Sequence, residues 1–368
     1  MLTAPEVIRA PAGERPANGH GRAPEIRWVN PLEHPAWDQE LRQFQDAIFF
    51  HTSAWARVLT ETYGFKPMSL MVHEENQVGA ILPGMELHGF PKGPRAVSLP
   101  FTDHTAPLLR NATQARLLLE AVKTCGRMRG WRTWECRGGH PCWPESPASL
   151  SFYRHTLDLT VGEAELYSGF EPSVRRALRK AAGHRLEVRV EDSPEAMDAY
   201  FALHCRTRRR HGLPPQPKAF FESIHRHVIA RGHGHVFLVR YRGCPIAGGV
   251  FFHWNRGVIF KFGASDTRHQ VLRPNNLLMW YAIAHYAGRD YERLDLGRTS
   301  LSQEGLRRFK LGLGSTETRL DYLKYDLRQD AFVTDGGDLT HGWHNAFFRL
   351  LPLTVLRAFG TVLYRHLA

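Results

Sequence analysis

Residues 235–266 read HVFLVRYRGCPIAGGVFFHWNRGVIFKFGASD and predict three consecutive β-strands, because β-branched and aromatic residues dominate each of the segments 235–243, 244–255 and 257–266. Two helices are expected before these strands, PEAMDAYFALHCRTRRRHG and KAFFESIHRHVIARG. After them we expect a helix in PNNLLMWYAIAHYAGRD, a strand in RLDLG, a short helix in GLRRFKLGL and a strand in ETRLDYLKY. This order of elements predicts an α/β unit.

The first half of the chain shows a similar order. A helix is expected from Ala54 to Tyr63, with Thr52 or Ser53 as its N-cap and Gly64 at its end. MSLMVHEENQVGAILPGMEL predicts a hairpin, TQARLLLEAVKTCGRMRG predicts a helix, and AVSLP and WRTWECR predict strands. The similarity in order between the two halves fits a duplicated α/β fold, although no repeat of individual residues is visible.

The composition excludes several classes of protein. The chain has 368 residues, of which 43% are hydrophobic and 23% are charged, which excludes a disordered chain and a multi-span membrane protein. No apolar run is long enough for a signal peptide or a transmembrane helix, so we expect a cytoplasmic protein. The 48 Lys and Arg residues exceed the 36 Asp and Glu residues by 12, which favours a polyanionic partner: nucleic acid, anionic lipid or a phosphorylated substrate.

The cysteines do not suggest a disulfide framework or a metal site. Five cysteines without a CxxC pair indicate a reducing compartment. Cys136, His140 and Cys142 are close in sequence, but structural zinc needs four ligands and no second pair follows. We therefore expect no metal.

Two basic segments remain open to two interpretations. Residues 172–189 contain six Lys and Arg residues against Glu187 alone, which describes either a solvated helix face or a binding surface. Residues 352–368 predict a helix with Leu353, Leu356, Phe359 or Gly360, and Leu363 on one face and arginines on the other. Such a helix can pack on the core of its own protein or lie on an anionic membrane.

The sequence lacks the motifs that mark several enzyme classes. It contains no nucleophile elbow, Walker loop, HExxH motif or dinucleotide fingerprint. No glycine lies between Asp266 and Trp280, where an acetyl-CoA enzyme of the Gcn5-related fold usually holds pyrophosphate, and this weakens a coenzyme A interpretation. Four polar segments are instead expected at the ends of elements around a common cleft: PFTDHTAPL, TRRRHGLPP, RLDLGRTS and FKLGLG.

Six segments of the second half carry a family resemblance: RRALRKA, TRRRHGLP, KFGASD, PNNLLMWYAI, LDLGRTS and GLRRFKLGLG. They resemble the Fem-type peptidoglycan bridge-forming aminoacyltransferases (FemABX) and their exopolysaccharide-associated relatives. These relatives are usually labelled Gcn5-related (GNAT) N-acyltransferases. FHTSAWARVLTETYG, GAILPGMEL and SLPFTDHTAPL extend the resemblance, which covers residues 48–326. It implies a mixed α/β fold of two tandem acyltransferase-like domains that share a cleft, here without a coiled-coil arm. The expected divisions are a disordered tail at 1–25, a first domain at 26–165, a second, catalytic domain at 166–318, a return strand at 319–336 and a basic amphipathic helix at 337–368.

The resemblance also implies roles for individual residues. Phe309 and Lys310 match a family FK pair whose lysine stabilises the oxyanion of acyl transfer, a role that suits a fixed ammonium. Asp103 corresponds to an acid that orients or deprotonates the acceptor amine. The residues expected to bind substrate are Arg209 or Arg210, which would hold phosphate, together with Lys261, Asn276, Gly297 and Arg298.

The function that we expect is transfer of an acyl group to an amine of a phosphorylated or lipid-linked cell-envelope precursor, of peptidoglycan or exopolysaccharide. The acyl donor is either aminoacyl-tRNA or acyl-CoA, and no tightly bound cofactor is expected. Two alternatives stay open: a conventional acyl-CoA-dependent N-acetyltransferase, and a non-catalytic nucleic-acid or envelope scaffold protein. Peripheral contact with an anionic membrane through the C-terminal helix is a further expectation.

Overall fold

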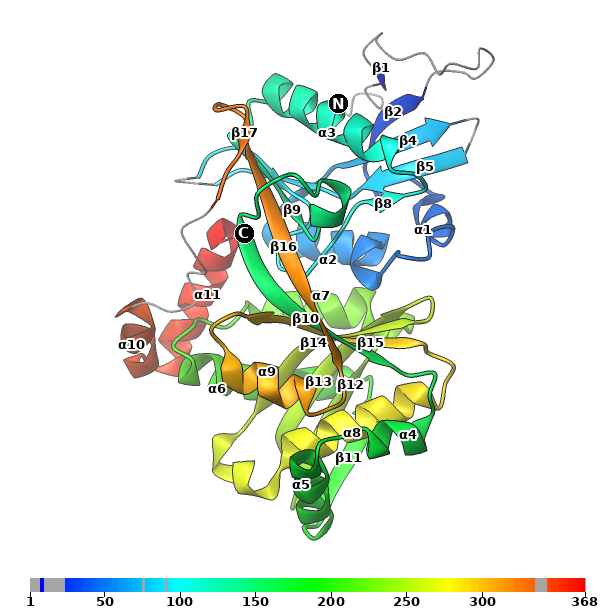
Figure 1. The fold of residues 1–368 in the computed structure, drawn as a ribbon. Helices are drawn as coiled ribbons and strands as arrows, with labels where there is room; N and C mark the ends of the chain where they lie inside the picture. Colours follow the sequence, from blue (N-terminus) through cyan, green and yellow to red (C-terminus); the bar gives the residue numbers. More distant parts are fainter. Residues whose placement is uncertain (1–6, 10–23, 75–76, 90–91, 335–342, 368) are drawn as a thin grey trace. The chain divides into compact units, whose positions relative to one another are not determined.

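The computed structural model describes residues 7–9, 24–74, 77–89, 92–334 and 343–367. The chain divides into two compact units (Figure 1). Unit 1 consists of residues 1–151 and 320–337 with residue 368, and unit 2 consists of residues 152–319 and 338–367. The chain thus crosses from one unit to the other more than once.

Unit 1 contains two groups of strands and the long helix α3. Its elements are β1 (Val7–Arg9), β2 (Glu25–Val29), α1 (Trp37–Leu41), the 3-10 helix η1 (Phe49–His51), α2 (Ser53–Tyr63), β3 (Lys66–Pro67), β4 (Ser69–Glu74), β5 (Gln77–Leu82), β6 (Met85–Leu87), β7 (Arg95–Val97), β8 (Leu108–Leu109), α3 (Thr113–Met128), β9 (Thr133–Arg137), the 3-10 helix η2 (His140–Cys142) and β17 (Ala331–Phe332). One sheet has the order β1-β2-β4-β5-β8. In the second group, β9 pairs with β7 and with the end of β16 (Thr316–Asp326), which returns to this unit.

The expected elements of unit 1 form for the expected reasons. The Thr52 hydroxyl accepts a hydrogen bond from the Trp55 amide at 3.4 Å, and Gly64 ends α2 at a φ of 72°. The predicted disordered tail, residues 1–25, lies largely outside the described residues. The described residues 7–9 differ from the prediction of disorder, because they form β1, which pairs with β2 in an antiparallel arrangement.

Unit 2 is built on six neighbouring strands in the order β11-β12-β13-β14-β15-β10. Its elements are β10 (Leu150–Asp158), α4 (Glu163–Ser168), α5 (Pro172–Ala182), β11 (Leu186–Glu191), α6 (Pro194–Arg210), α7 (Lys218–His227), the 3-10 helix η3 (Ile229–Arg231), β12 (Gly234–Tyr241), β13 (Cys244–Trp254), β14 (Gly257–Ser265), the 3-10 helix η4 (Thr267–Leu272), α8 (Pro274–Ala287), β15 (Arg293–Ser300), α9 (Glu304–Leu311), α10 (Trp343–Leu350) and α11 (Leu353–Leu367). The three strands predicted in residues 235–266 form an antiparallel meander, and β15 joins β14 in a parallel pair.

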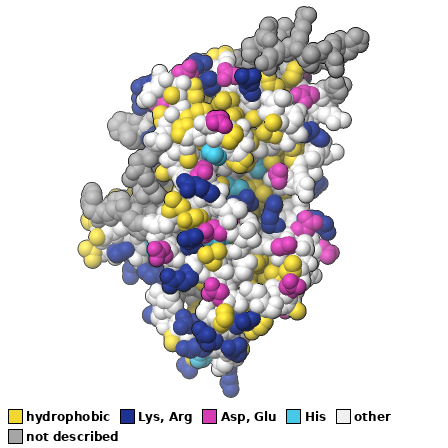
Figure 2. Space-filling model, viewed as in Figure 1, with side chains coloured by type: hydrophobic (Ala, Val, Ile, Leu, Met, Phe, Trp, Pro, Cys, Tyr) yellow, Lys and Arg dark blue, Asp and Glu magenta, His cyan; other side chains and the backbone are white. Residues whose placement is uncertain are grey.

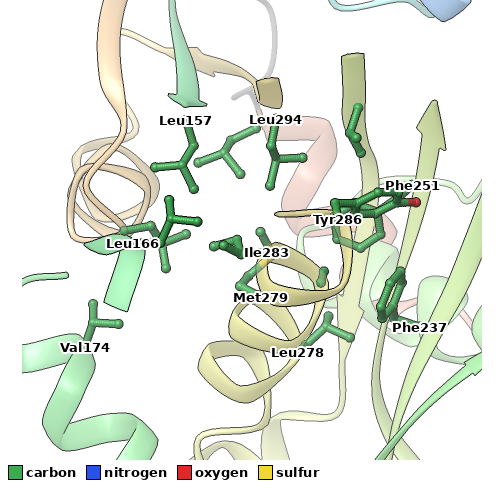
Figure 3. Packing of buried hydrophobic residues seen from close by; sticks show 14 of the residues in the cluster. Leu157, Leu166, Val174, Phe237, Phe251, Leu278, Met279, Ile283, Tyr286 and Leu294 are labelled. Atoms are coloured by element: carbon green, nitrogen blue, oxygen red, sulfur yellow. The ribbon is translucent and has the colours of Figure 1, made fainter. Parts of the chain in front are cut away.

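Helices cover both faces of the strands of unit 2. Helix α8 packs on one face, where Phe251 contacts Phe260 and Tyr286 at ring-centroid distances of 4.9 and 5.9 Å (Figure 3). Helices α6 and α7 cover the other face, where Phe262 contacts Phe221 at 5.5 Å. The strands thus carry an apolar layer on each face, as the fold of an α/β unit requires.

Three details of unit 2 differ from the sequence-based expectations. The basic segment at 172–189 is not one helix face, because α5 ends at Ala182 and β11 pairs with the edge of β12. The sequence pattern does not predict strand β10, at residues 150–158. The C-terminal segment forms two helices, α10 and α11, and the buried side chains of α11 are Leu356 and Tyr364, whereas Phe359 is 42% exposed.

In the described part of the chain the longest helix is α6, with 17 residues, so no coiled-coil arm is present there. None of the described helices has the length and apolar character that spanning a bilayer requires.

Candidate active site

The parallel strands β14 and β15 separate after a short paired segment. Their pairing ends at Ile259 and Asp295, although β14 continues to Ser265 and β15 to Ser300. Beyond this point the main-chain groups of the two strands do not pair with each other. The sheet therefore opens between the carboxyl ends of two adjacent parallel strands, which is where α/β folds place ligands.

Each strand carries a β-bulge just past the last paired residues. In β14, Phe260 pairs with Phe251 and Phe262 pairs with Val250, so Lys261 is the extra residue. In β15, the register against β10 shifts between Asp295 and Arg298, and Gly297 in this interval has a φ of 74°. A bulge bends its strand and increases its twist, so two bulges at the same level explain why the strands diverge.

A buried carboxylate holds the bulge of β15 in place. Asp295 is 3% exposed; its Oδ1 accepts a hydrogen bond from the Gly297 amide at 2.7 Å, and its Oδ2 accepts one from Arg154 Nε at 2.7 Å. Glycine is the residue that adopts a positive φ without steric cost. Glycine thus permits the backbone conformation at position 297, and the Asp295 carboxylate, paired with Arg154, holds it in place.

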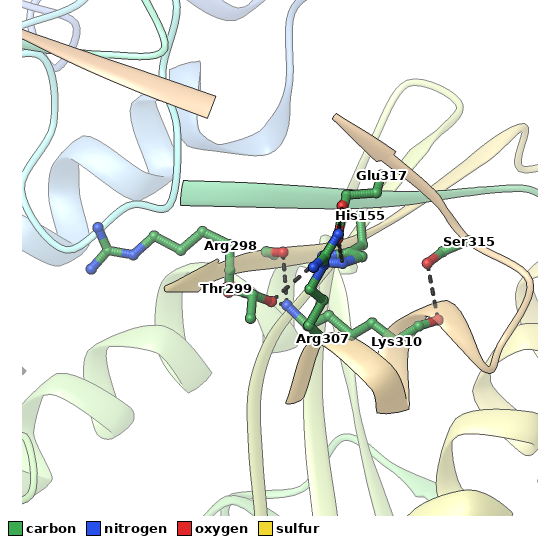
Figure 4. A network of polar contacts seen from close by, with 8 residues as sticks. His155, Arg298, Thr299, Arg307, Lys310, Ser315 and Glu317 are labelled. Carbon is green, nitrogen blue, oxygen red and sulfur yellow. Dashed lines mark hydrogen bonds and ion pairs between the residues drawn. The ribbon is translucent and has the colours of Figure 1, made fainter. Parts of the chain in front are cut away.

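Lys310 binds the same bulge from α9. Its Nζ donates hydrogen bonds to the carbonyl oxygens of Gly297 at 2.8 Å and Arg298 at 3.0 Å (Figure 4). Lys310 is only 4% exposed, whereas Leu306 on the same short helix is 41% exposed. A buried ammonium must be satisfied by hydrogen bonds or an opposite charge, and here main-chain carbonyl groups provide them. The arrangement fixes a positive charge at the opening of the sheet.

A polar network extends from Lys310 along β10 and β16. Arg307 forms a two-point ion pair with Glu317, with both N···O distances at 2.7 Å, and Glu317 Oε2 lies 3.0 Å from His155 Nε2. His155 Nδ1 lies 3.5 Å from the Thr299 hydroxyl. Burial, and next the charge of Lys310, lower the pKa of His155, so the imidazole is neutral at pH 7. A neutral His155 that donates from Nε2 to Glu317 accepts from Thr299 at Nδ1.

The structure brings four of the predicted site residues to the opening. Gly297, Arg298 and Lys310 lie there as described, with the Arg298 guanidinium 4.4 Å above the Phe152 ring. Lys261 is the bulge residue of β14, and its Nζ lies 5.3 Å from the centre of the Phe262 ring.

Two further predicted residues lie on nearby elements of unit 2. Phe309 packs against the apolar core of unit 2, next to Lys310 on α9. Asn276 is partly buried in the first turn of α8.

The other predicted residues lie elsewhere. Arg209 and Arg210 are exposed at the end of α6, whereas Arg208 turns inward and donates to the Pro214 carbonyl at 3.2 Å and the Tyr364 hydroxyl at 2.7 Å. Asp103 belongs to unit 1, where its carbonyl oxygen accepts a hydrogen bond from the Tyr322 hydroxyl. The roles assigned to Asp103, Arg209 and Arg210 stay predictions.

Sequence reasoning did not find His155, Glu317, Arg307 and Asp295, which surround Lys310 and Gly297. A signal for His155 is its position in SFYRHTLD, where a lone histidine takes an inward-facing position between apolar residues. Its partners come from segments more than 140 residues away, so their contact with it leaves no local pattern.

The described residues contain no group of three or more His, Cys, Asp or Glu side chains arranged to hold a metal ion. Cys136 and Cys142 lie in unit 1, where burial raises the pKa of the Cys136 thiol well above its ordinary value and that of Cys142 to about 11. Both thiols are therefore protonated at neutral pH and behave as small apolar side chains in the core of unit 1.

One known domain family matches the part of the chain that contains this opening. Residues 169–317 match the sequence model of an acetyltransferase (GNAT) domain, a segment that contains both bulges and Lys310. No curated protein matches the chain.

Three solved structures share the fold over most of the chain. FemX is 12% identical, with 82% of this chain and 97% of that chain covered and a TM-score of 0.65. The C-terminal domain of a protein from Agrobacterium fabrum, named as a lysylphosphatidylglycerol synthetase, is 16% identical, with 88% and 98% covered and a TM-score of 0.52. A tandem GNAT protein from the clavulanic acid biosynthesis pathway is 11% identical, with 82% and 98% covered and a TM-score of 0.50. At these identities the likeness shows the fold, and it confirms the predicted mixed α/β architecture of tandem GNAT type. Residues 169–317 carry a GNAT-type acetyltransferase domain, and the protein is an acyltransferase.

Proposed function

We propose that this protein transfers an aminoacyl or other acyl group to an amine of a phosphorylated or lipid-linked cell-envelope precursor, of peptidoglycan or exopolysaccharide. The observation that carries the proposal is the opening between β14 and β15, with the Lys310 ammonium held 2.8 and 3.0 Å from two carbonyl oxygens of β15. The fold shared with FemX and with the domain named for lysylphosphatidylglycerol supports an envelope acceptor. Both candidate donors are made in the cytoplasm, so we place the reaction on the cytoplasmic side of the membrane.

The reaction needs a site that tolerates developing negative charge. The acceptor amine attacks the acyl carbonyl carbon, a C–N bond forms, and the carbonyl oxygen becomes a tetrahedral oxyanion. The intermediate then releases the donor's hydroxyl or thiol group, the acceptor nitrogen loses one proton, and the leaving group gains one. A preorganised positive charge stabilises the oxyanion, and losing one such group typically costs about 100- to 1,000-fold in turnover. We assign this role to Lys310; a role of Asp103 in proton transfer stays an expectation from the family resemblance.

A polyanionic donor fits the charge on α5. Arg176, Arg179 and Lys180 are exposed on the side opposite the buried residues Val174 and Leu178. Among the described residues none of these three cations forms an ion pair. Figure 2 shows the dense group of Lys and Arg side chains in the region where Figure 1 places α5.

Helix α5 also begins at the site. The Glu171 amide, which precedes the first residue of α5, donates a hydrogen bond to the Gly312 carbonyl at 2.9 Å, two residues beyond Lys310. An RNA backbone lying along α5 can therefore carry its acylated end toward Lys310. This adjacency favours aminoacyl-tRNA as the donor.

The turn between β14 and α8 is a poor site for the pyrophosphate of coenzyme A. Pro274 has no amide hydrogen, and no glycine lies between Asp266 and Trp280.

The test measures acyl transfer to membrane-extracted, lipid-linked precursor with radiolabelled aminoacyl-tRNA and, separately, with acetyl-CoA. We expect transfer from aminoacyl-tRNA, with a KM that rises steeply with salt. Lys310→Met should lower kcat about 100-fold, while Lys66→Met, an exposed lysine in β3, should match the wild type. Full turnover by a folded Lys310→Met variant would remove the oxyanion role, and transfer from acetyl-CoA alone would identify the conventional N-acetyltransferase.

Charge reversal on α5 tests donor binding separately from the transfer step. The double variant Arg176→Glu/Arg179→Glu should raise the KM for aminoacyl-tRNA about tenfold or more and leave kcat unchanged. Arg57→Glu, on the exposed side of α2 in unit 1, is the control and makes half of this change in charge away from α5. Equal KM values for the two variants would show that α5 does not bind the donor.

A further inference from the structure

Helices α10 and α11 expose a concentration of large apolar side chains. Five such side chains lie within 16 residues: Phe347 (52% exposed), Leu350 (84%), Val355 (40%), Phe359 (42%) and Val362 (62%). Scattered exposed hydrophobic residues are normal on a protein surface, but a contiguous group marks an interaction site.

These side chains belong to one surface. Val355, Phe359 and Val362 are spaced i, i+4 and i+7, so they project from the same side of α11. Phe348 connects the two helices, with its ring centre 5.8 Å from Phe347 and 6.0 Å from Phe359. Leu350 lies at the end of α10, immediately before the Leu351-Pro352 connection to α11. We call this group the α10–α11 surface.

The opposite side of α11 is already attached to unit 2. Leu356 is fully buried, and the Tyr364 hydroxyl accepts a hydrogen bond from Arg208 at 2.7 Å and donates one to the Pro214 carbonyl at 3.1 Å. The Arg357 guanidinium lies 5.2 Å from the centre of the Phe201 ring on α6. Packing on the protein's own core therefore accounts for one side of the helix and leaves the α10–α11 surface exposed.

The charge of this segment is of one sign. Residues 339–368 contain three arginines and no Asp or Glu. Arg349 and Arg365 are exposed, and in the described part of the chain neither forms an ion pair. Figure 2 shows hydrophobic side chains at the edge where Figure 1 places α10, with Lys and Arg side chains beside them. Apolar side chains flanked by arginines, without carboxylates, are the composition of helices that lie on anionic bilayers.

We propose that the α10–α11 surface docks this protein on an anionic phospholipid membrane. Phe347, Leu350 and Val362 enter the boundary between headgroups and acyl chains, and Arg349 and Arg365 bind lipid phosphates. A second copy of the chain is a poorer occupant, because a symmetric dimer through this surface would bring like-charged arginines together. This inference goes beyond the proposed function, since it holds whichever group is transferred, and it would hold the transfer domain at the surface where a lipid-linked acceptor lies.

The test is flotation of the full chain with vesicles, which needs no activity. Vesicles contain either phosphatidylcholine alone or phosphatidylcholine with about 30% phosphatidylglycerol, which gives an anionic surface. We expect the protein to float with the anionic vesicles and to stay in solution with the neutral ones. Leu350→Glu/Val362→Glu should lower the bound fraction about tenfold. Because both side chains are more than half exposed, the melting temperature should not change.

Two controls make the result decisive. Met128→Glu, at a 65% exposed position in α3 of unit 1, adds one of these two negative charges to an unrelated apolar position and should leave flotation unchanged. Arg349→Gln/Arg365→Gln should weaken binding to the anionic vesicles. The proposal is overturned if the wild type does not float with anionic vesicles, if Met128→Glu reduces flotation as much as the double variant, or if light scattering shows a dimer that Leu350→Glu/Val362→Glu dissociates.

Discussion

Gly297→Ala tests whether the bulge of β15 positions Lys310 for chemistry. Gly297 has a φ of 74°, and an alanine there costs about 1–2 kcal/mol because its Cβ crowds the neighbouring carbonyl. The backbone relieves this strain by rotating the peptide that carries the Gly297 carbonyl, which accepts a hydrogen bond from Lys310 Nζ at 2.8 Å. A displaced ammonium no longer lies where the oxyanion forms; full loss of such a group costs about 100- to 1,000-fold in turnover, so a partial displacement should cost about 10- to 100-fold.

Gly64→Ala is the matched control. Gly64 ends α2 in unit 1 with a φ of 72°, and a Cβ there would meet no atom within 4 Å. Both variants therefore carry the same backbone strain, and each should lower the melting temperature of its unit by about 2–4 °C per kcal/mol. Only Gly297→Ala should lower kcat, with the KM for the donor unchanged.

The assays are calorimetric unfolding and steady-state kinetics of the transfer reaction on both variants. A Gly297→Ala enzyme with wild-type kcat would refute the reasoning, because it would show that Lys310 acts independently of the bulge. Equal losses of kcat in the two variants would refute it as well, since strain in unit 1 would then matter as much as strain at the opening.

Three further changes test other parts of the structure. Tyr364→Phe removes the hydrogen bonds to Arg208 and Pro214, so unit 2 should lose about 1–2 kcal/mol of unfolding free energy, measured against Tyr281→Phe at a 49% exposed position. Burial is the main cause that lowers the pKa of His253 to about 4. Because the unfolded chain protonates this residue at its ordinary pKa of about 6.5, its contribution to stability should be constant above that value and fall as the pH drops toward 4, with about 2 kcal/mol lost by pH 5. His253→Gln should remove this part of the fall in a urea-unfolding series and leave the part that comes from His204 and His285, whose pKa values are lowered to about 3 and about 4. Glu317→Gln breaks the two-point pair with Arg307 and should lower the melting temperature of unit 2, measured by calorimetry.

The sequence was sufficient for the elements whose signals are local. Strands β12, β13 and β14 and helix α8 are long and strongly patterned, and they form where the pattern predicts. Helix α2 shows the same agreement, because its cap at Thr52 and its end at Gly64 are properties of single residues. The tandem architecture followed from the order of these elements and from the resemblance to a family.

The features that form the site depend on pairing between distant segments. A bulge is defined by the partner strand, so Lys261 and Gly297 cannot be recognised as bulge residues from β14 and β15 alone. Helix α9 shows the limit most clearly, since residue type alone predicts a buried leucine and an exposed lysine, whereas Leu306 is 41% exposed and Lys310 only 4% exposed. The resemblance selected Lys310, which the structure places at the opening, and its role in the reaction stays a prediction; its buried position came only from the fold.

The distribution of charge predicts which kinetic constant responds to salt. Three cations next to the opening are held by partners within the protein: Arg154 pairs with Asp295, Arg307 pairs with Glu317, and Lys310 binds main-chain carbonyl groups. Much of the excess of 12 positive charges is instead on exposed surfaces such as α5 and the α10–α11 surface. Salt screens exposed charges over a Debye length of about 10 Å at 0.1 M and about 3 Å at 1 M, and it affects buried pairs much less. Raising the salt concentration should therefore raise the KM for aminoacyl-tRNA and release the protein from anionic vesicles, while kcat at saturating donor stays constant. A fall in kcat with salt, at constant KM, would mean that the exposed charges take part in the transfer step itself.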